Sequence, residues 1–479
     1  KAARRATSVL PKPTSPHTSR SIGVRASAAL KAWRVPVTSI AVVVVVGLVL
    51  TVAWPVLLQR FRVNPNAQEM ESTYIQRNID ATRAAYGLDK LKTEQYKVTD
   101  KGEQGALAKE GDTTAQIRLL DPQVVSPTFK QLQQSKQYYT FADTVAVDKY
   151  DVDGVSQDTV IAARELDLDG LDNRNWVNDH TVYTHGYGVV AAYGNKVAAD
   201  GQPQFFESSI PTQGKLTESQ KYEPRIYFSP NAPEYSIVGA PKGMDSWEFD
   251  YPTGSQGATN TFDGDGGPSV GNIFSRLLYA VRFGSDQILF SDRVTSDSQI
   301  LYDRNPIDRV QKVAPYLELD NDPYPSVVDG RIVWIVDGYT LSANYPYSSI
   351  VSLRDAISDT TNTTPRVALD DVNYIRNSVK ATVDAYDGTV TLYEQDEHDP
   401  VLQAWMKVFP DTVKAKSTIS KELAEHLRYP EDLFKVQRML LAKYHVNDPV
   451  TFFSTSDFWD VPLDPNQIGR ASCRERVSS

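Results

Sequence analysis

A long apolar stretch stands near the start of the chain. No charged residue occurs between Val35 and Gln59, and the stretch contains the valine run Val42 to Val46. At about 1.5 Å of rise per residue, these 25 residues would form a helix of roughly 37 Å, which exceeds the roughly 30 Å hydrocarbon core of a bilayer. The pattern therefore predicts a transmembrane helix over residues 35–59.

Apolar residues at helical spacing follow this stretch. Tyr74, Ile79 and Tyr86 recur on one helical face, and Asn66 with Glu69 three residues later has the form of a capping box. The spacing predicts a helix over residues 67–86.

The pattern then changes to short β-branched and aromatic runs broken by Gly, Pro, Asp and Asn, which predict strands between about residues 115 and 398. Clear examples are Arg225–Phe228, Ile332–Val336 and Thr389–Tyr393. Asp-Gly pairs are strong hairpin signals, and they predict turns at Asp329-Gly330, Asp337-Gly338 and Asp387-Gly388.

Helical patterning returns after Pro400, where Leu433, Val436, Leu440 and Tyr444 form an apolar stripe. The fold class predicted from these patterns is a membrane protein, with one transmembrane helix here plus a mixed α+β, strand-rich extracytoplasmic domain with a helical C-terminal part. The predicted segments are a basic cytoplasmic segment 1–34, the transmembrane helix 35–59, a strand-rich extracytoplasmic region 63–398 opened by the helix 67–86, a truncated helical region 399–467, and a tail 468–479. The tail reads like translated sequencing-adapter DNA and is interpreted as an artefact.

The charges beside the apolar stretch predict its orientation. Eight Lys and Arg residues precede it, whereas only Arg60 and Arg62 follow closely. By the positive-inside rule, the N-terminus lies in the cytoplasm and the large domain lies outside the plasma membrane. A cleaved signal peptide is the alternative, because Thr51-Val52-Ala53 suits a signal peptidase. The apolar stretch is, however, longer than the usual ~7 to 15 residues.

The remainder of the chain is acidic. Of the 479 residues, those from 63 to 467 include 37 basic and 59 acidic side chains, a net charge of −22. This balance disfavours nucleic acid as a partner and leaves membrane lipid and other envelope proteins as the expected partners. The single cysteine, Cys473, excludes an intrachain disulfide within this sequence.

Two groups of residues are candidates for a metal site. Glu165, Asp167 and Asp169 occupy alternate positions before Gly170, as in a calcium loop, although the twelfth position of such a loop would be Trp176 instead of Glu. His180 and His185 lie five residues apart, a spacing that places them on different faces of a helix or strand. The metal candidates are therefore Glu165, Asp167, Asp169 and His185, with calcium as the only cofactor considered and no catalytic residue predicted.

Several stretches together resemble uncharacterised protein family (UPF) 0182, large integral membrane proteins of actinobacterial type. The stretches are Ala81–Leu88, Ile117–Pro122, His180–Gly186, Arg331–Thr340, Asn344–Ser348, Tyr374–Glu397 and Glu422–Phe453. The resemblance covers roughly Val35 to Asn466. It implies further transmembrane helices before the one seen here and more extracytoplasmic chain after it, so this chain is interpreted as a fragment. The family provides no catalytic or ligand residues to transfer.

Three functional hypotheses follow. The first is a non-enzymatic envelope protein whose acidic domain binds or scaffolds partners outside the cytoplasm, which the lack of catalytic motifs favours. The second is an envelope metal-dependent hydrolase using His185 with Glu165 or Asp179. The third is the extracytoplasmic part of a transporter.

Overall fold

The structure is a computed structural model that describes residues 37–63, 66–94, 105, 117–241, 243–253, 257–358 and 367–460. The predicted basic segment 1–34 and the tail 468–479 lie outside the described residues. The chain divides into two compact units. The first comprises Lys1–Gln76 with Asp448–Ser454, and the second comprises Arg77–Asn447 with Thr455–Ser479.

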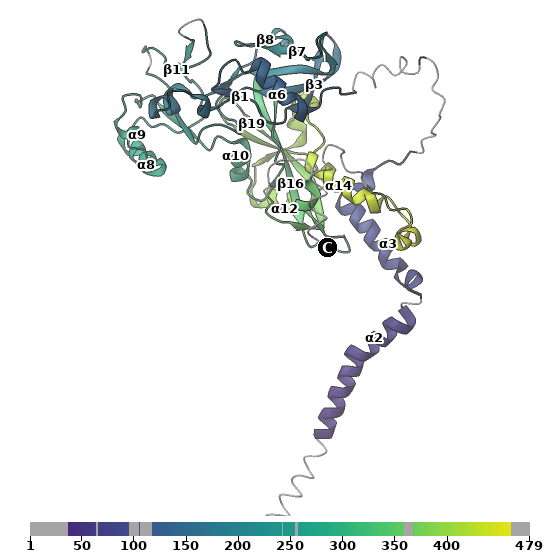
Figure 1. Ribbon diagram of the computed structural model, residues 1–479. Helices are drawn as coiled ribbons and strands as arrows, with labels where there is room; N and C mark the ends of the chain where they lie inside the picture. Colours follow the sequence, from purple (N-terminus) through teal and green to yellow (C-terminus); the bar gives the residue numbers. More distant parts are fainter. Residues whose placement is uncertain are drawn as a thin grey trace, which may run out of the picture. The chain divides into compact units, whose positions relative to one another are not determined.

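The first unit contains an apolar helix over Val37–Phe61, of which α2 (Trp54–Leu58) is the labelled part (Figure 1). Its 25 residues are long and apolar enough to cross a membrane, in agreement with the stretch predicted over residues 35–59. Local π-helical turns occur at η1 (Val49–Ala53) and η2 (Gln59–Val63). This unit also holds α15 (Pro449–Ser454) and the start of α3 (Ala67–Ala85), which matches the helix predicted over residues 67–86.

The second unit contains two large sheets, whose strands pair mostly antiparallel. The first has the order β2-β3-β6-β7-β8, and all its neighbours are antiparallel. Its strands are β2 (Ala146–Val152), β3 (Val155–Ala163), β6 (Val189–Val197), β7 (Pro203–Ser208) and β8 (Gln213–Gly214). Asp153 and Gly154 both have positive φ between β2 and β3, the geometry of a two-residue hairpin turn.

The second sheet is built around the long pair β16 (Arg331–Ser342) and β19 (Tyr374–Asp384). Its other strands are β14 (Glu318–Leu319), β15 (Tyr324–Val328), β20 (Val390–Glu394) and β21 (Val413–Lys414), of which β21 pairs parallel with β20. The turn predicted at Asp329-Gly330 is confirmed, because Val328 pairs with Arg331 and both turn residues have positive φ.

The turn predicted at Asp337-Gly338 is wrong. Asp337 lies inside β16 opposite Lys380 of β19, and the ladder shifts register between Gly338 and Tyr339. The Asp337 carboxylate forms an ion pair with Lys380 of the neighbouring strand. This partner allows a charged side chain to lie buried inside β16.

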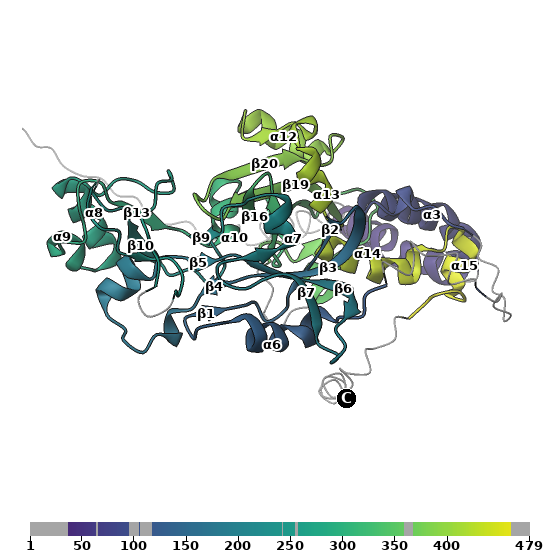
Figure 2. The ribbon, with the colours of Figure 1, turned by 90° about the horizontal axis from the view of Figure 1, so that it is seen from above.

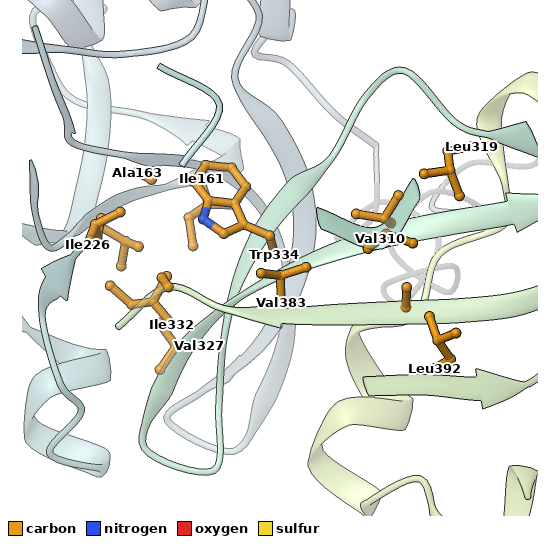
Figure 3. Close-up of a cluster of buried hydrophobic side chains, with 14 of the residues drawn as sticks. Ile161, Ala163, Ile226, Val310, Leu319, Val327, Ile332, Trp334, Val383 and Leu392 are labelled. Carbon is orange, nitrogen blue, oxygen red and sulfur yellow. The ribbon is translucent and has the colours of Figure 1, made fainter. Parts of the chain in front are cut away.

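The two sheets share one hydrophobic core. Ile161 and Ala163 come from the first sheet, whereas Trp334 and Val383 come from the second, and all four are buried in the same cluster (Figure 3). The Trp334 indole N–H donates to the Phe228 carbonyl at 2.8 Å, so its polar atom is satisfied inside this core.

Helices and short strands surround the sheets. Figure 2 shows α8 (Ile273–Phe283) and α9 (Gln287–Phe290) at one end of the second unit, beyond the pair β10 (Tyr235–Val238) and β13 (Gln299–Tyr302). The helical residues expected after Pro400 form α12 (Pro400–Val408), α13 (Lys421–His426) and α14 (Glu431–Tyr444). The other elements are α6 (Pro122–Gln133), α7 (Lys215–Ser219), α10 (Pro306–Val313), α11 (Leu353–Ile357), β1 (Tyr139–Thr140), β4 (Glu165–Leu166), β5 (Gly186–Tyr187), β9 (Arg225–Ile226), β11 (Glu248–Phe249), β12 (Thr259–Asn260), β17 (Val351–Ser352), β18 (Asp371–Val372) and the 3-10 turns η4 (Leu88–Lys90), η5 (Leu168–Gly170) and η7 (Lys416–Thr418), with the π-helical turn η6 (Asn178–Val182).

Candidate functional site

The three acids of the predicted calcium loop have separate protein partners. The buried Glu165 accepts the Asn231 backbone N–H at 2.9 Å, and burial raises the pKa of its carboxyl to about 7. Asp167 caps η5 by accepting the Asp169 N–H at 3.1 Å, and Asp169 forms a 2.8 Å ion pair with Arg174. Each of the three acids therefore makes a hydrogen bond or an ion pair within the protein.

His185 is enclosed in a buried network of side chains. Its Nδ1 lies 2.9 Å from the Thr184 hydroxyl and its Nε2 lies 3.3 Å from Asp250, which also receives two hydrogen bonds from Arg225. The Thr184 hydroxyl in turn donates to Glu248 at 3.2 Å. The His185 side chain is 0% exposed, and that of Asp250 is 4% exposed.

The other candidates also have structural partners. His180 stacks on Tyr235 with a centroid separation of 3.9 Å, and Asp179 forms a 2.8 Å ion pair with Arg174. His185 therefore bonds Thr184 and Asp250 rather than Glu165 or Asp179. Over the described ranges, no three His, Cys, Asp or Glu side chains lie together in a way that could hold a metal ion.

A cavity of about 890 Å³ lies beside α14, and its lining combines three aspartates, here called the floor, with apolar side chains. Asp320, Asp322 and Asp337 contribute carboxylates, whereas Phe434, Leu441 and Trp459 contribute apolar surface. All of these residues belong to the second unit. Cavities of this size accommodate small organic ligands.

Two of the floor carboxylates are held firmly by the fold. Asp320 accepts the Tyr339 hydroxyl at 2.7 Å and the Asp432 backbone N–H at 3.2 Å. Asp337 forms an ion pair with Lys380, whose ammonium also donates to the Arg428 carbonyl at 2.7 Å. Burial raises the pKa of Asp337 and lowers that of Lys380, so desolvation opposes the ionised pair while mutual attraction favours it.

The third floor carboxylate, Asp322, is in a different situation. Its side chain faces the solvent of the cavity, and no described residue donates a hydrogen bond to it. Protein surrounds it on its other sides, and this desolvation raises its pKa to about 6, although Arg428 opposes the shift. The neighbouring Asp432 has its pKa raised to about 7 by burial and by Asp320.

The arginines at the cavity are engaged with other protein groups. Arg118 makes two hydrogen bonds to Asp158, at 3.0 and 2.8 Å. The Arg428 guanidinium lies 3.5 Å from the centroid of the Tyr324 ring and donates to the Val147 carbonyl at 3.1 Å. Arg428 and Lys435 act on Asp322 through their charge, whereas no described residue donates a hydrogen bond to its carboxylate.

No sequence motif indicates this cavity. Asp320 and Asp322 stand more than 100 residues before Phe434, so no local motif joins them. A signal was nevertheless present at Asp337, which directly follows the apolar run Ile332–Val336, because a carboxylate inside such a strand requires a buried partner.

A second unusual feature is the apolar surface of α8 and α9. Val281 is 76% exposed and Phe290 is 80% exposed, and Ile273, Phe274, Leu277 and Leu278 are also exposed. The helix itself is well terminated. Asn272 caps its start by accepting the Ser275 N–H at 2.8 Å, and Gly284 ends it with a φ of 62°. The opposite side, including Ala280 and Tyr279, packs into a small core with Ile237 and Ile300.

Comparison with known proteins gives a consistent picture. The sequence profile described as uncharacterised protein family (UPF0182) matches residues 18–474, beyond the expected span 35–466 at both ends. A UPF0182 protein of Bifidobacterium longum is 78% identical over 451 residues, which are 93% of this chain and 42% of that protein. A UPF0182 protein of Leifsonia xyli subsp. xyli is 54% identical over 436 residues, which are 90% of this chain and 44% of that protein.

A UPF0182 protein of Tropheryma whipplei is 54% identical over 438 residues, 91% of this chain and 45% of that protein. The chain thus spans less than half the length of these curated relatives. No solved structure matches it.

Proposed function

Because the chain belongs to uncharacterised protein family UPF0182, whose name specifies no activity, we propose a function from its geometry: it is a membrane-anchored binding protein that docks another envelope protein on α8 and α9. The observation that carries this proposal is the exposed apolar face of these two helices, defined by Ile273, Phe274, Leu277, Leu278, Val281 and Phe290.

The spacing of these residues makes one continuous surface. The five positions from Ile273 to Val281 recur at the intervals that align on one side of a helix, and Phe290 extends the surface onto α9. Soluble surfaces rarely gather so many large apolar groups without a partner. Each such side chain contributes roughly 1.5 to 3 kcal/mol when it is buried, which is sufficient to offset the entropy that association costs.

The basic residues of α8 favour a protein partner over a lipid surface. Helices that lie on membranes use free Arg and Lys side chains to reach lipid phosphates. Here Arg276 donates to the Val270 carbonyl at 3.0 Å, and the Arg282 guanidinium lies 4.5 Å from the Tyr302 ring centroid. Both guanidinium groups are therefore engaged by the domain itself. The net charge of −22 over residues 63–467 further disfavours an anionic membrane.

The membrane anchor in this proposal is the apolar helix Val37–Phe61. Its length supports a crossing of the bilayer, and the eight basic residues before it support a cytoplasmic N-terminus. The docking face on α8 and α9 would then lie outside the cytoplasm, where it meets other envelope proteins.

Site-specific photo-crosslinking in cells tests the proposal. A photoreactive residue replaces Val281 or Phe290 in the full protein, and a third probe at Asp143, an exposed position that pairs with Lys130 of α6, is the control. We expect one heavier product, containing the same second protein, from both α8–α9 probes and none from the control. Leu277→Glu combined with either probe should remove that product without changing the thermal midpoint.

Other crosslinking results would overturn the proposal. A crosslink to phospholipid would identify a membrane-contacting face, and a crosslink to another part of the same polypeptide would identify an internal packing surface. Products that differ between the two probes, or that persist with Leu277→Glu, would show that the apolar face does not determine the contact.

A further inference from the structure

We propose that the cavity beside α14 binds an organic cation, with an ammonium or guanidinium head group on the Asp322 carboxylate and an apolar body against Phe434 and Leu441. This inference rests on the cavity alone and is independent of the docking face on α8 and α9.

The lining of the cavity contains more acidic than basic side chains. Its acidic lining residues are Asp320, Asp322, Asp337, Glu431 and Asp460, and its basic lining residues are Arg118, Arg428 and Arg438. The buried Lys435 is already bound by Glu431 at 3.0 Å and by Asp432 at 3.2 Å. Acidic groups therefore outnumber basic ones at the lining, so the cavity attracts cations and repels anions.

The acids of the cavity differ in how the protein compensates them. Asp337 is paired with Lys380, and Asp320 accepts hydrogen bonds from Tyr339 and from backbone N–H groups. Asp322 borders the cavity without a hydrogen-bond donor among the described residues. The surrounding protein raises the pKa of this carboxyl, although its side chain is exposed in the cavity. A ligand cation would supply the missing charge and hydrogen bonds.

The apolar side chains of the cavity would contact the body of the ligand. Phe434 is 55% exposed and Trp459 is 59% exposed, although both are large apolar residues at the cavity. Together with Leu441 and Val147, they offer contacts to an apolar body next to the charged floor.

A matched set of probes tests the inference. The full chain in lipid nanodiscs is titrated calorimetrically at pH 7.5 with 4-phenylbutylamine, 4-phenylbutan-1-ol and 4-phenylbutanoate, which share a phenyl ring on a four-carbon chain and carry a positive, a neutral and a negative head group. Heats from empty nanodiscs are subtracted. We expect the amine to bind at least tenfold more tightly than the alcohol, and the carboxylate to bind more weakly than either.

Two substitutions test the head-group contact and the apolar contact separately. Asp322→Asn should reduce the preference for the amine over the alcohol to less than threefold, whereas the control Asp143→Asn, at an exposed acid of another region, should leave the preference unchanged. Phe434→Ala should weaken the amine and the alcohol by a similar factor. Equal thermal midpoints show that each variant is folded. Equal affinities of the amine and alcohol, an unchanged preference in Asp322→Asn, or no binding of any probe would overturn the inference.

Discussion

The imidazole Nδ1 of His426 lies 2.9 Å from Asp148 Oδ1, and this contact joins helix α13 to strand β2 across 278 residues of sequence. The same carboxylate accepts the Ser326 hydroxyl at 2.7 Å, and the His426 ring lies against Tyr150. One buried carboxylate thereby connects both sheets to the helical C-terminal region.

Replacing Asp148 should destabilise the domain. Asp148→Ala leaves the buried His426 and Ser326 groups without their acceptor, so we expect the free energy of unfolding to fall by about 2 to 4 kcal/mol. Urea unfolding measures the change. Asp151→Ala, at an exposed position of the same strand, is the matched control and should cost less than about 0.5 kcal/mol. Equal effects of the two substitutions would contradict a special role for Asp148.

Glu165 should make the domain less stable as the pH rises. Burial raises the pKa of its carboxyl to about 7 in the folded state, above its ordinary value near 4.3 in the unfolded chain. Between these values the folded state binds a proton that the unfolded state has released, so the contribution of Glu165 to stability is greatest below about pH 4 and is lost progressively as the pH rises to 7.

Glu165→Gln should remove this contribution. The amide keeps an acceptor for the Asn231 N–H but cannot ionise, so we expect the variant to gain on the order of 2 kcal/mol relative to the parent protein at pH 8 and little at pH 4. Denaturant unfolding at both pH values is the measurement. A gain of the same size at pH 4 and pH 8 would rule out titration of Glu165 as the cause.

Arg304 should resist conservative replacement. Its guanidinium is buried, and it donates to the Tyr227 carbonyl and the Ser236 hydroxyl, each at 2.6 Å, and to the Thr184 carbonyl. Burial lowers its pKa to about 9, which shows how costly this charge is without a carboxylate partner. Lysine lacks the planar fork that reaches three acceptors.

We therefore expect Arg304→Lys to lower the free energy of unfolding by about 2 to 4 kcal/mol. Arg174→Lys, which alters an exposed arginine paired with Asp169 and Asp179, should change it by less than about 1 kcal/mol. Thermal unfolding of both variants makes the comparison. A tolerated Arg304→Lys would mean that a single ammonium satisfies the site.

The orientation of the chain can be checked directly. If the helix Val37–Phe61 crosses the membrane with the N-terminus inside, protease added to intact spheroplasts should digest the domain that follows it and spare a cytoplasmic marker. Digestion should approach completion within the time that degrades a known extracytoplasmic protein. Full protection of the domain would reverse the proposed topology.

Local signals predicted part of the fold well. At Asp329-Gly330 the sequence requires a tight turn, both residues adopt positive φ, and β15 and β16 pair on either side. The same dipeptide at Asp337-Gly338 predicted a turn that does not exist, because Lys380 stands opposite Asp337 in the neighbouring strand. The preference of an Asp-Gly pair for turns takes no account of a partner that lies 43 residues away in the sequence.

The cavity could not be predicted in the same way. Its floor comes from the segment Asp320–Asp322 and from β16, whereas Phe434 and Leu441 come from α14. The volume between them depends on how α14 packs against the second sheet, which is a tertiary property without a sequence periodicity. For α8, in contrast, the spacing of the apolar residues does indicate a helix. The spacing does not indicate whether other parts of the protein cover the apolar face of that helix.

The pairing of α3 with α14 has a consequence for the order of folding. Within the second unit, the Gln437 amide donates to the Tyr86 carbonyl at 2.8 Å, and the Tyr444 hydroxyl donates to Asn78 at 2.9 Å, across 351 and 366 residues. At roughly 5 to 20 residues per second, synthesis of the intervening chain takes roughly 20 to 70 s. Hairpins such as β2–β3 can form during that time, but the early helix must wait for its late partner. We therefore expect α3 to lack its C-terminal partner throughout the synthesis of the intervening chain.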